Sequence, residues 1–138
     1  MIVLDTNVLS TLMSESPHRR VVQWLDKQPR TSIWTTAITV LEIRFGLQIL
    51  PGGKRRARLM RSFELLLEKI ENRVLTFDRV AAEAAGDLMA WRRSKGRSVD
   101  LRDSMIAGIV IAQHASMATR NVARFDDLSI SVVNPWSH

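Results

Sequence analysis

Short runs of β-branched and aliphatic residues alternate along the chain with longer segments in which apolar residues recur every three or four positions. The short runs predict five strands, at residues 2–4, 31–36, 74–77, 116–119 and 130–133. The longer segments predict helices at residues 8–13, 18–27, 37–50, 54–70, 80–93 and 101–114. Because strands and helices alternate, we expect a single α/β domain with a mainly parallel five-stranded sheet and helices on both faces.

The first predicted strand ends in a carboxylate, Asp5. Parallel α/β sheets bind their ligands just outside the carboxyl ends of the strands, which is where Asp5 is expected. The alternative is that Asp5 only caps the helix that follows, a position that Thr6 or Asn7 fills equally well. We interpret Asp5 as a site residue and ask which other carboxylates converge on it.

A second candidate, Glu42, shares a face of its predicted helix with Ile38 and Phe45. A glutamate on an apolar face is seldom left without a partner, because burying a lone charge is very costly. The partner is either a nearby arginine, such as Arg44 or Arg120, or a cation shared with other carboxylates. We favour the shared cation.

A third candidate, Asp103, lies in the first turn of the helix at residues 101–114, in phase with Ile106. An acid in this position also interacts favourably with the helix dipole, which is the structural alternative. Asp100, three residues earlier, is better explained as the N-cap of the same helix. Asp126 and Asp127 follow the fourth predicted strand and so lie near the same edge of the sheet.

Three carboxylates that meet in a small volume stay ionised only if a cation neutralises them. The chain has no cysteine, and its three histidines are far apart in sequence, which excludes thiolate and histidine-rich zinc sites. Oxygen ligands alone favour Mg²⁺ or Mn²⁺. Such an ion activates water and stabilises charge on phosphate, so phosphodiester hydrolysis is the expected chemistry.

Composition adds a preference for a polyanionic partner. The 138 residues carry a net charge of +6, which favours nucleic acid, although ordinary solubilising charge explains the excess equally well. No apolar run approaches the roughly 20 residues that span a bilayer, and no signal peptide is evident, so we expect a cytoplasmic protein that does not contact the membrane. The basic residues that are candidates for contacts to an RNA backbone, or else simply solvated helix surface, are Arg19, Arg20, Arg92, Arg93, Lys95 and Arg97.

Five segments in register resemble PIN-domain ribonucleases, the toxins of VapBC-type toxin–antitoxin pairs, and in particular the FitB-like branch. The segments are residues 4–10 (LDTNVLS), 37–46 (AITVLEIRFG), 103–108 (DSMIAG), 118–121 (ATRN) and 134–136 (NPW). The resemblance covers essentially the whole chain, as one PIN domain over residues 1–138. It implies a three-layer α/β/α fold and an endoribonuclease activity that depends on Mg²⁺ or Mn²⁺.

The resemblance also assigns residues to the site. Asp5, Glu42 and Asp103 match the family's acidic positions; Asp5 and Asp103 are expected to hold the metal, and Glu42 to orient or deprotonate the attacking water. A fourth acid often follows the Thr-Arg pair, but Asn121 stands there, and Arg124 stands where some members have an acid. The supporting candidates are Asn7, Asp100, Asn121 and Asp126.

The family further implies a cognate VapB-type antitoxin, a homodimer, an RNA substrate, and promoter DNA bound only through the antitoxin complex. The hairpin at residues 45–63 is a candidate docking surface, with Leu50 and Leu59 either in the core or at the interface. The departures at Asn121 and Arg124 keep one alternative open, a PIN-fold protein that binds nucleic acid or a partner through a degraded acidic site and does not catalyse.

Overall fold

The structure, a computed structural model, describes residues 1–138 and contains one five-stranded sheet in which all neighbouring strands are parallel. The strands are β1 (Ile2–Leu4), β2 (Ile33–Thr36), β3 (Val74–Leu75), β4 (Ser116–Ala118) and β5 (Val132–Val133). They lie in the order β3-β2-β1-β4-β5, so the chain crosses over the central strand β1 between β3 and β4. The parallel five-stranded sheet expected from the sequence is confirmed.

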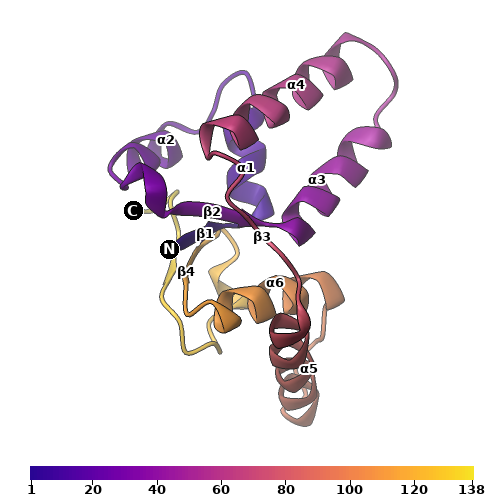
Figure 1. Ribbon diagram of the computed structural model, residues 1–138, viewed down its shortest axis with the longest axis vertical. Helices are drawn as coiled ribbons and strands as arrows, with labels where there is room; N and C mark the ends of the chain where they lie inside the picture. Colours follow the sequence, from indigo (N-terminus) through magenta and orange to yellow (C-terminus); the bar gives the residue numbers. More distant parts are fainter.

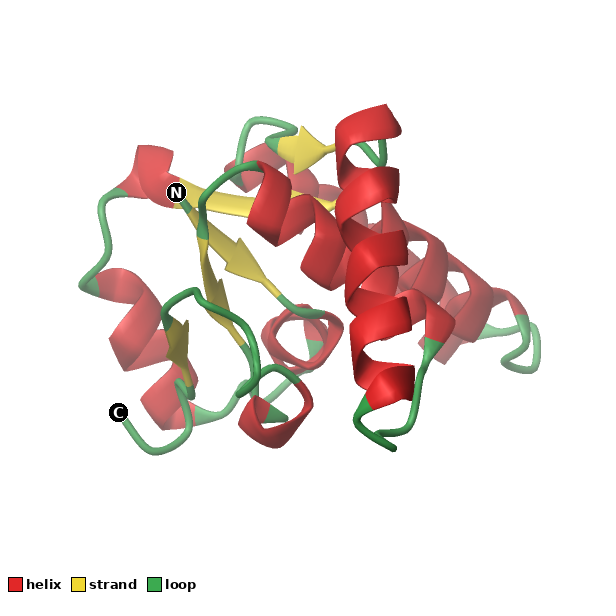
Figure 2. Cartoon of the chain, turned by 90° about the horizontal axis from the view of Figure 1, so that it is seen from below, coloured by secondary structure: helices red, strands yellow, loops and turns green.

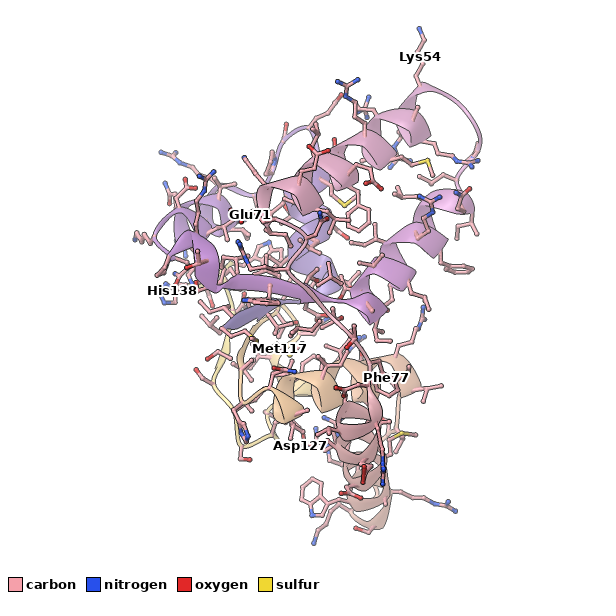
Figure 3. All side chains as sticks on the ribbon, viewed as in Figure 1. Lys54, Glu71, Phe77, Met117, Asp127 and His138 are labelled. Atoms are coloured by element: carbon pink, nitrogen blue, oxygen red, sulfur yellow. The ribbon has the colours of Figure 1, made fainter.

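Six α-helices surround this sheet (Figures 1 and 2). They are α1 (Thr6–Met13), α2 (Arg19–Asp26), α3 (Ala37–Gln48), α4 (Lys54–Lys69), α5 (Arg79–Ser94) and α6 (Leu101–Ala112). Helices α3 and α4 project from the sheet as a hairpin with Lys54 near its tip, and α5 extends in the opposite direction (Figure 3). None of the six combines the length and the apolar character needed to cross a membrane.

The two faces of the sheet each build a separate hydrophobic core. Val3 and Met117 join the cluster that contains residues of α5 and α6, whereas the next residue of each strand, Leu4 and Ala118, joins the cluster that contains residues of α1 to α4. Successive side chains of a strand point to opposite faces, so a strand of three residues serves both cores. The three-layer α/β/α arrangement follows from this alternation.

The predicted elements differ from the observed ones mainly at the ends. Residues 30–32 form a 3₁₀ turn, where the sequence prediction placed the start of β2, and β5 begins at Val132 instead of residue 130. The edge strands β3 and β5 each have one neighbour and pair over only two residues. Leu50 and Leu59 are half-buried and pack against the core on the α1–α4 side without being fully enclosed by it.

The apolar face predicted for α3 is buried at Ile38 but exposed further along the helix. Leu41, Phe45 and Ile49 are 53%, 58% and 67% exposed, whereas Ile43 and Leu47 pack into the core. Helix α3 carries two apolar stripes, and the spacing of apolar residues does not distinguish the covered stripe from the uncovered one. Glu42 therefore lies at the border between the core and solvent and not on a wholly buried face.

Helices α5 and α6 pack at very close range. A Cβ atom built on Gly108 of α6 would lie 2.5 Å from the carbonyl oxygen of Ala81 and 2.7 Å from Cβ of Ala85, both in α5. Only a residue without a side chain permits this approach. Because Asp103 lies on the same helix, the contact at Gly108 helps to fix its position relative to the sheet.

Candidate active site

The candidate site lies where the chain reverses its direction of travel across the sheet. From β1 the chain moves outward through β2 and β3, then returns to the other side of β1 to form β4 and β5. In parallel α/β sheets, ligands bind at this switch point, beyond the carboxyl ends of the two strands concerned. Asp5 follows β1 and Thr119 follows β4, and the backbone N–H of Asp5 donates to the carbonyl of Ala118 at 2.9 Å.

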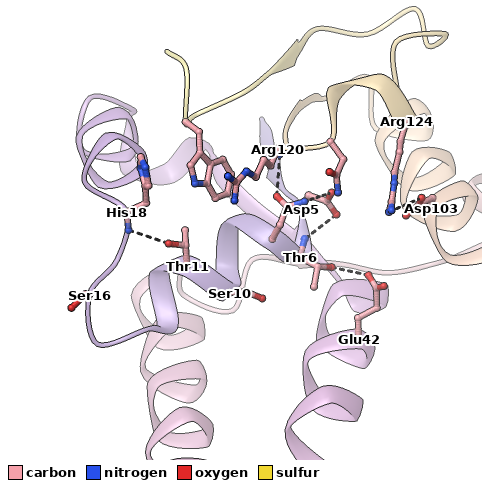
Figure 4. Close-up of a pocket in the computed structure, with 13 residues that line it drawn as sticks. Asp5, Thr6, Ser10, Thr11, Ser16, His18, Glu42, Asp103, Arg120 and Arg124 are labelled. Carbon is pink, nitrogen blue, oxygen red and sulfur yellow. Dashed lines mark hydrogen bonds and ion pairs between the residues drawn. The ribbon is translucent and has the colours of Figure 1, made fainter.

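A cavity of about 580 Å³ opens at this point, and its lining is almost entirely polar. Asp5, Glu42 and Asp103 all line it, although they lie far apart in sequence, and Figure 4 shows them on the cavity wall. The start of α1 supplies the first, α3 the second and α6 the third. The structure thus brings together the three carboxylates that the sequence singled out.

Asp5 is both a helix cap and a cavity residue. Its Oδ1 accepts a hydrogen bond from the backbone N–H of Thr6 at 2.8 Å, and its Oδ2 accepts one from the hydroxyl of Thr119 at 2.7 Å. The side chain of Asn7 lies 3.4 Å from the same Oδ2. With only 6% of Asp5 exposed, burial raises the pKa of its carboxyl, and the hydrogen bond from Thr119 opposes this effect.

Glu42 contacts both a hydroxyl group and an arginine. The Thr6 hydroxyl donates to Oε1 of Glu42 at 2.7 Å, and Nη1 of Arg102 lies 3.8 Å from Oε2. Neither Arg44 nor Arg120, the partners considered from the sequence, pairs with it. Since Thr6 follows Asp5 directly, the same turn of chain that presents Asp5 also orients Glu42.

Asp103 faces the cavity from the first turn of α6. Its pKa is raised, mainly by burial and further by the nearby carboxylates of Asp100, Asp5 and Glu42, while Arg124 lowers it. Nη1 of Arg124 lies 3.2 Å from Oδ2 of Asp103. The side chain of Asp100 accepts from the backbone N–H of Asp103 at 2.9 Å, which confirms Asp100 as the N-cap of α6 and leaves it outside the cavity.

Two amide side chains complete the floor of the cavity. Oδ1 of Asn7 accepts from the backbone N–H of Arg120 at 3.1 Å, which ties the start of α1 to the loop after β4. Asn121, at the position where an acid was expected, also lines the cavity, and its backbone N–H donates to the hydroxyl of Thr119 at 3.1 Å. Both residues proposed as supporting ligands are therefore next to Asp5.

Asp126 does not reach the site, contrary to the sequence expectation. It is exposed and pairs with Arg97 at 3.2 Å. Its neighbour Asp127 forms a bidentate ion pair with Arg92, with both distances 2.8 Å and side chains only 3% and 4% exposed. Because both side chains are buried, this ion pair has a structural role. It holds the loop after β4 against α5.

The basic residues named from the sequence consequently divide into groups. Arg92 is buried and cannot contact RNA, which corrects that expectation. Arg97 borders a smaller hollow of about 350 Å³ that shares Asp103 and Arg124 with the main cavity. The exposed candidates that line neither hollow are Arg19, Arg20, Arg93 and Lys95.

The arginines that line the main cavity come from the loop after β4. They are Arg120 and Arg124, and the sequence-based list of RNA contacts missed both. Their position in the sequence could have identified both arginines as cavity residues, because residues that follow a parallel strand lie at the same edge of the sheet as Asp5. Trp136 is the single hydrophobic residue of the lining.

The donor set fits a hard divalent cation, but the side chains are not closed around one. All the candidate ligands are oxygens, and burial raises the pKa of two of the carboxyls, so a cation would relieve the cost of ionising them. No group of three or more acidic or histidine side chains is close enough in this structure to hold a metal ion. Binding one requires Arg124 to leave Asp103 and the carboxylates to converge.

Comparison with known proteins agrees with this geometry. Residues 2–130 match the family model described as PIN domain. The chain is 39% identical to VapC ribonuclease Y4jK from Sinorhizobium fredii, covering 99% of this chain and 98% of that protein, and 33% identical to Toxin FitB from Neisseria gonorrhoeae, covering 99% of each. The solved structure described as FitAB bound to an IR36 DNA fragment superposes with a TM-score of 0.89 at 33% identity, covering 99% of this chain and 96% of that one. The chain belongs to the PIN-domain family.

Proposed function

We propose that residues 1–138 act as a single PIN domain, a metal-dependent endoribonuclease that serves in the cytoplasm as the toxin of a toxin–antitoxin pair. The observation that carries the proposal is that Asp5, Glu42 and Asp103 all line one polar cavity at the switch point of the sheet. The names of the relatives support it, since one is a VapC ribonuclease and another a toxin. The net charge of +6 suits a phosphodiester substrate.

In the proposed reaction Asp5 and Asp103 hold Mg²⁺ or Mn²⁺, which would neutralise the carboxylates and favour ionisation of the attacking water. Glu42, held by the Thr6 hydroxyl, accepts the proton of that water. The water attacks phosphorus in line with the leaving 3′ oxygen, which takes a proton from solvent, and the products are a 5′-phosphate and a 3′-hydroxyl. Arg120 and Arg124 line the same cavity, and we assign them contacts to the phosphates of the RNA.

Cleavage of a structured RNA by the purified chain tests the proposal. We expect cleavage with Mg²⁺ or Mn²⁺, none with EDTA, and a loss of at least 100-fold in Asp5→Asn and Asp103→Asn. Asp126→Asn is the matched control, because this acid lies near the site but points away from it and pairs with Arg97. Equal cleavage by the wild type and both site variants would reject these residues as the site.

The proposal includes a homodimer formed through α3. Leu41, Phe45 and Ile49 form an exposed apolar stripe along one face of this helix, and such a stripe is unfavourable in water unless a partner covers it. We assign it to a second copy of the chain. Light scattering should give the mass of a dimer for the wild type and of a monomer for Phe45→Glu, while Leu65→Glu on the exposed side of α4 stays dimeric. A monomeric wild type contradicts the assignment.

The proposed protein partner is a VapB-type antitoxin, with promoter DNA contacted only through the complex. The relative solved as FitAB on DNA supports this partnership. Co-expression with a candidate VapB-type antitoxin should yield a complex that no longer cleaves RNA and that binds promoter DNA, whereas the chain alone leaves that DNA unbound. RNA cleavage that is undiminished in the co-purified complex would contradict this partnership.

A second candidate is a PIN-fold protein that binds RNA or a partner without catalysis. Asn121 in place of an acid and the ion pair of Arg124 with Asp103 favour this candidate. It predicts that the metal-loaded wild type binds RNA but leaves every substrate intact. The cleavage assay above therefore separates the two candidates directly.

A further inference from the structure

Two segments meet on one wall of the cavity. One supplies Arg120, after β4, to which the proposed reaction gives only a phosphate contact, and the other supplies Trp136, after β5, which the proposed reaction does not use. The guanidinium carbon of Arg120 lies 5.1 Å from the centre of the Trp136 ring, over its face. His18, from the start of α2, lies on the same wall, with its ring centre 6.1 Å from that of Trp136. All three residues line the cavity that holds Asp5 (Figure 4).

The backbone around this group fixes its position. Oδ1 of Asn134 accepts from the backbone N–H of Trp136 at 2.9 Å, and Pro135 between them is buried. The indole is half-buried and packs against the core on the α1–α4 side, so its base is anchored while it still lines the cavity. Arg120 is tied to Asn7 through its backbone N–H at 3.1 Å. The pair is therefore built from anchored residues.

The charge of Arg120 has no carboxylate to neutralise it. Arg124 pairs with Asp103 and Arg102 with Glu42, but no carboxylate of the chain lies within ion-pair distance of Arg120. The cavity is thus divided into an acidic wall, formed by the three carboxylates, and a second wall that offers a flat aromatic and guanidinium surface. An unpaired guanidinium over an indole next to a phosphate-cleaving site is suited to a base and its phosphate.

We propose that Arg120 and Trp136 form a stacking subsite for one unpaired nucleotide of the RNA, next to the phosphate that is cleaved. The base lies on the flat Arg120–Trp136 surface, and the guanidinium also contacts the adjoining phosphate. A base inside a duplex stacks on its neighbours and is not free to do this, so the subsite selects single-stranded segments, loops or bulges. The proposal rests on the proposed function only in placing the cleaved phosphate at Asp5.

Binding of a short single-stranded RNA in EDTA, where metal-dependent cleavage does not occur, tests the subsite. Trp136→Leu should weaken binding roughly tenfold, which is a typical contribution of one stacked base. Trp136→Phe should recover most of the affinity, because it restores an aromatic face. Trp91→Leu on α5 is the matched control, an exposed tryptophan away from the cavity, and should bind like the wild type.

A series of RNAs, each lacking the base at one position, identifies the stacked nucleotide. At one position, removal of the base should weaken binding to the wild type but not to Trp136→Leu, because the two changes remove the same contact. A 2-aminopurine at that position should lose fluorescence on binding the wild type and keep it with the variant. Circular dichroism confirms that each variant is folded.

The results distinguish this inference from the proposed function. Wild-type affinity and wild-type KM in a folded Trp136→Leu, with cleavage intact, overturn the subsite and leave the nuclease standing. Tryptophan-dependent binding without any cleavage by the wild type supports the subsite and rejects the nuclease. Equal weakening at every abasic position overturns the subsite, because the effect of Trp136 is then independent of a particular base.

Discussion

Nη1 of Arg124 lies 3.2 Å from Oδ2 of Asp103, so a cation of the protein itself already pairs with one of the proposed metal ligands. The arginine is 59% exposed, and an ion pair of this kind contributes about 0.2–1 kcal/mol. A divalent ion that binds Asp103 has to displace it. Under the proposed function the two cations compete for Asp103, and the weak ion pair adds only a small cost to metal binding.

Arg124→Gln is expected to bind Mn²⁺ roughly two- to fivefold more tightly than the wild type, because this variant removes the competing charge. Titration followed by electron paramagnetic resonance of free Mn²⁺ measures the affinity without reference to activity. Arg97→Gln is the control, since Arg97 pairs with Asp126 and Asp127 instead of the cavity carboxylates. Unchanged or weaker Mn²⁺ binding in Arg124→Gln contradicts the competition.

Asp5→Asn is expected to raise the melting temperature of the metal-free protein at pH 7.5. Burial raises the pKa of Asp5 in the folded state, so the folded protein loses stability as pH rises from the ordinary value of 3.8 through the raised pKa, and the cost is constant above it. The asparagine carries no charge, and its oxygen can still accept from Thr6. The increase in melting temperature of Asp5→Asn over the wild type should disappear below pH 3.8.

Thermal melts of both proteins in EDTA between pH 3.5 and 8 measure this difference. Asp103→Asn should behave in the same direction, because its pKa is also raised by burial and by neighbouring carboxylates. Asp126→Asn, at an exposed position, should show no gain. A melting temperature of Asp5→Asn below that of the wild type throughout this range would show that the charge of Asp5 stabilises the fold.

Asp127→Asn is expected to lower the free energy of unfolding by about 3 kcal/mol at pH 7, because it leaves the buried guanidinium of Arg92 without a counter-charge. The hydrogen bonds from Arg92 lower the pKa of Asp127. The stability that this pair provides is therefore fully present above pH 3.8 and is lost as pH falls through the lowered pKa.

Urea unfolding at several pH values measures that contribution. Asp126→Asn changes the adjacent but exposed acid, which pairs with Arg97, and is expected to cost about 1 kcal/mol or less. A similar cost for both variants would mean that burial of the pair adds nothing to its strength.

Gly108→Ala is expected to destabilise the protein by about 1–3 kcal/mol, since the added methyl group forces α6 away from Ala81 and Ala85 of α5. Gly86→Ala is the matched control within α5, where a Cβ meets nothing within 4 Å, and should stabilise by up to about 1 kcal/mol. Denaturant unfolding of both variants measures whether the free energy of unfolding falls in Gly108→Ala and rises in Gly86→Ala. A neutral Gly108→Ala would mean that the two helices separate at little cost.

Two acidic residues of the candidate site, Asp5 and Asp103, could be singled out from the sequence because each lies at an element boundary that local patterns define. Glu42 lies inside α3 and was singled out instead because it shares a helix face with apolar residues. Asp5 ends an apolar strand and Asp103 begins a capped helix, and parallel strands bring such boundaries to one edge of a sheet. The pairing of Arg92 with Asp127 could not be predicted, because its partners are 35 residues apart and no local pattern joins them. The stacking of Arg120 on Trp136 depends on the same kind of long-range contact.

The exposed stripe of α3 illustrates another limit. Phe45 was expected on the apolar face of its helix together with Ile38, and Leu41 and Ile49 continue the same spacing. The structure covers a different face of the helix, through Ile43 and Leu47. Which of two apolar faces is covered depends on where the next helix packs, and this information is not contained in the helix itself.

The central position of β1 affects when the site forms during synthesis. Asp5 is synthesised before the rest of the site, because Thr119, which donates to it, follows 114 residues later, after both α5 and α6. Asp103 and Asn121 also belong to the later half of the chain. A nascent or truncated chain that stops before β4 therefore has no assembled cavity, and under the proposed function it would be unable to cleave the message from which it is being translated.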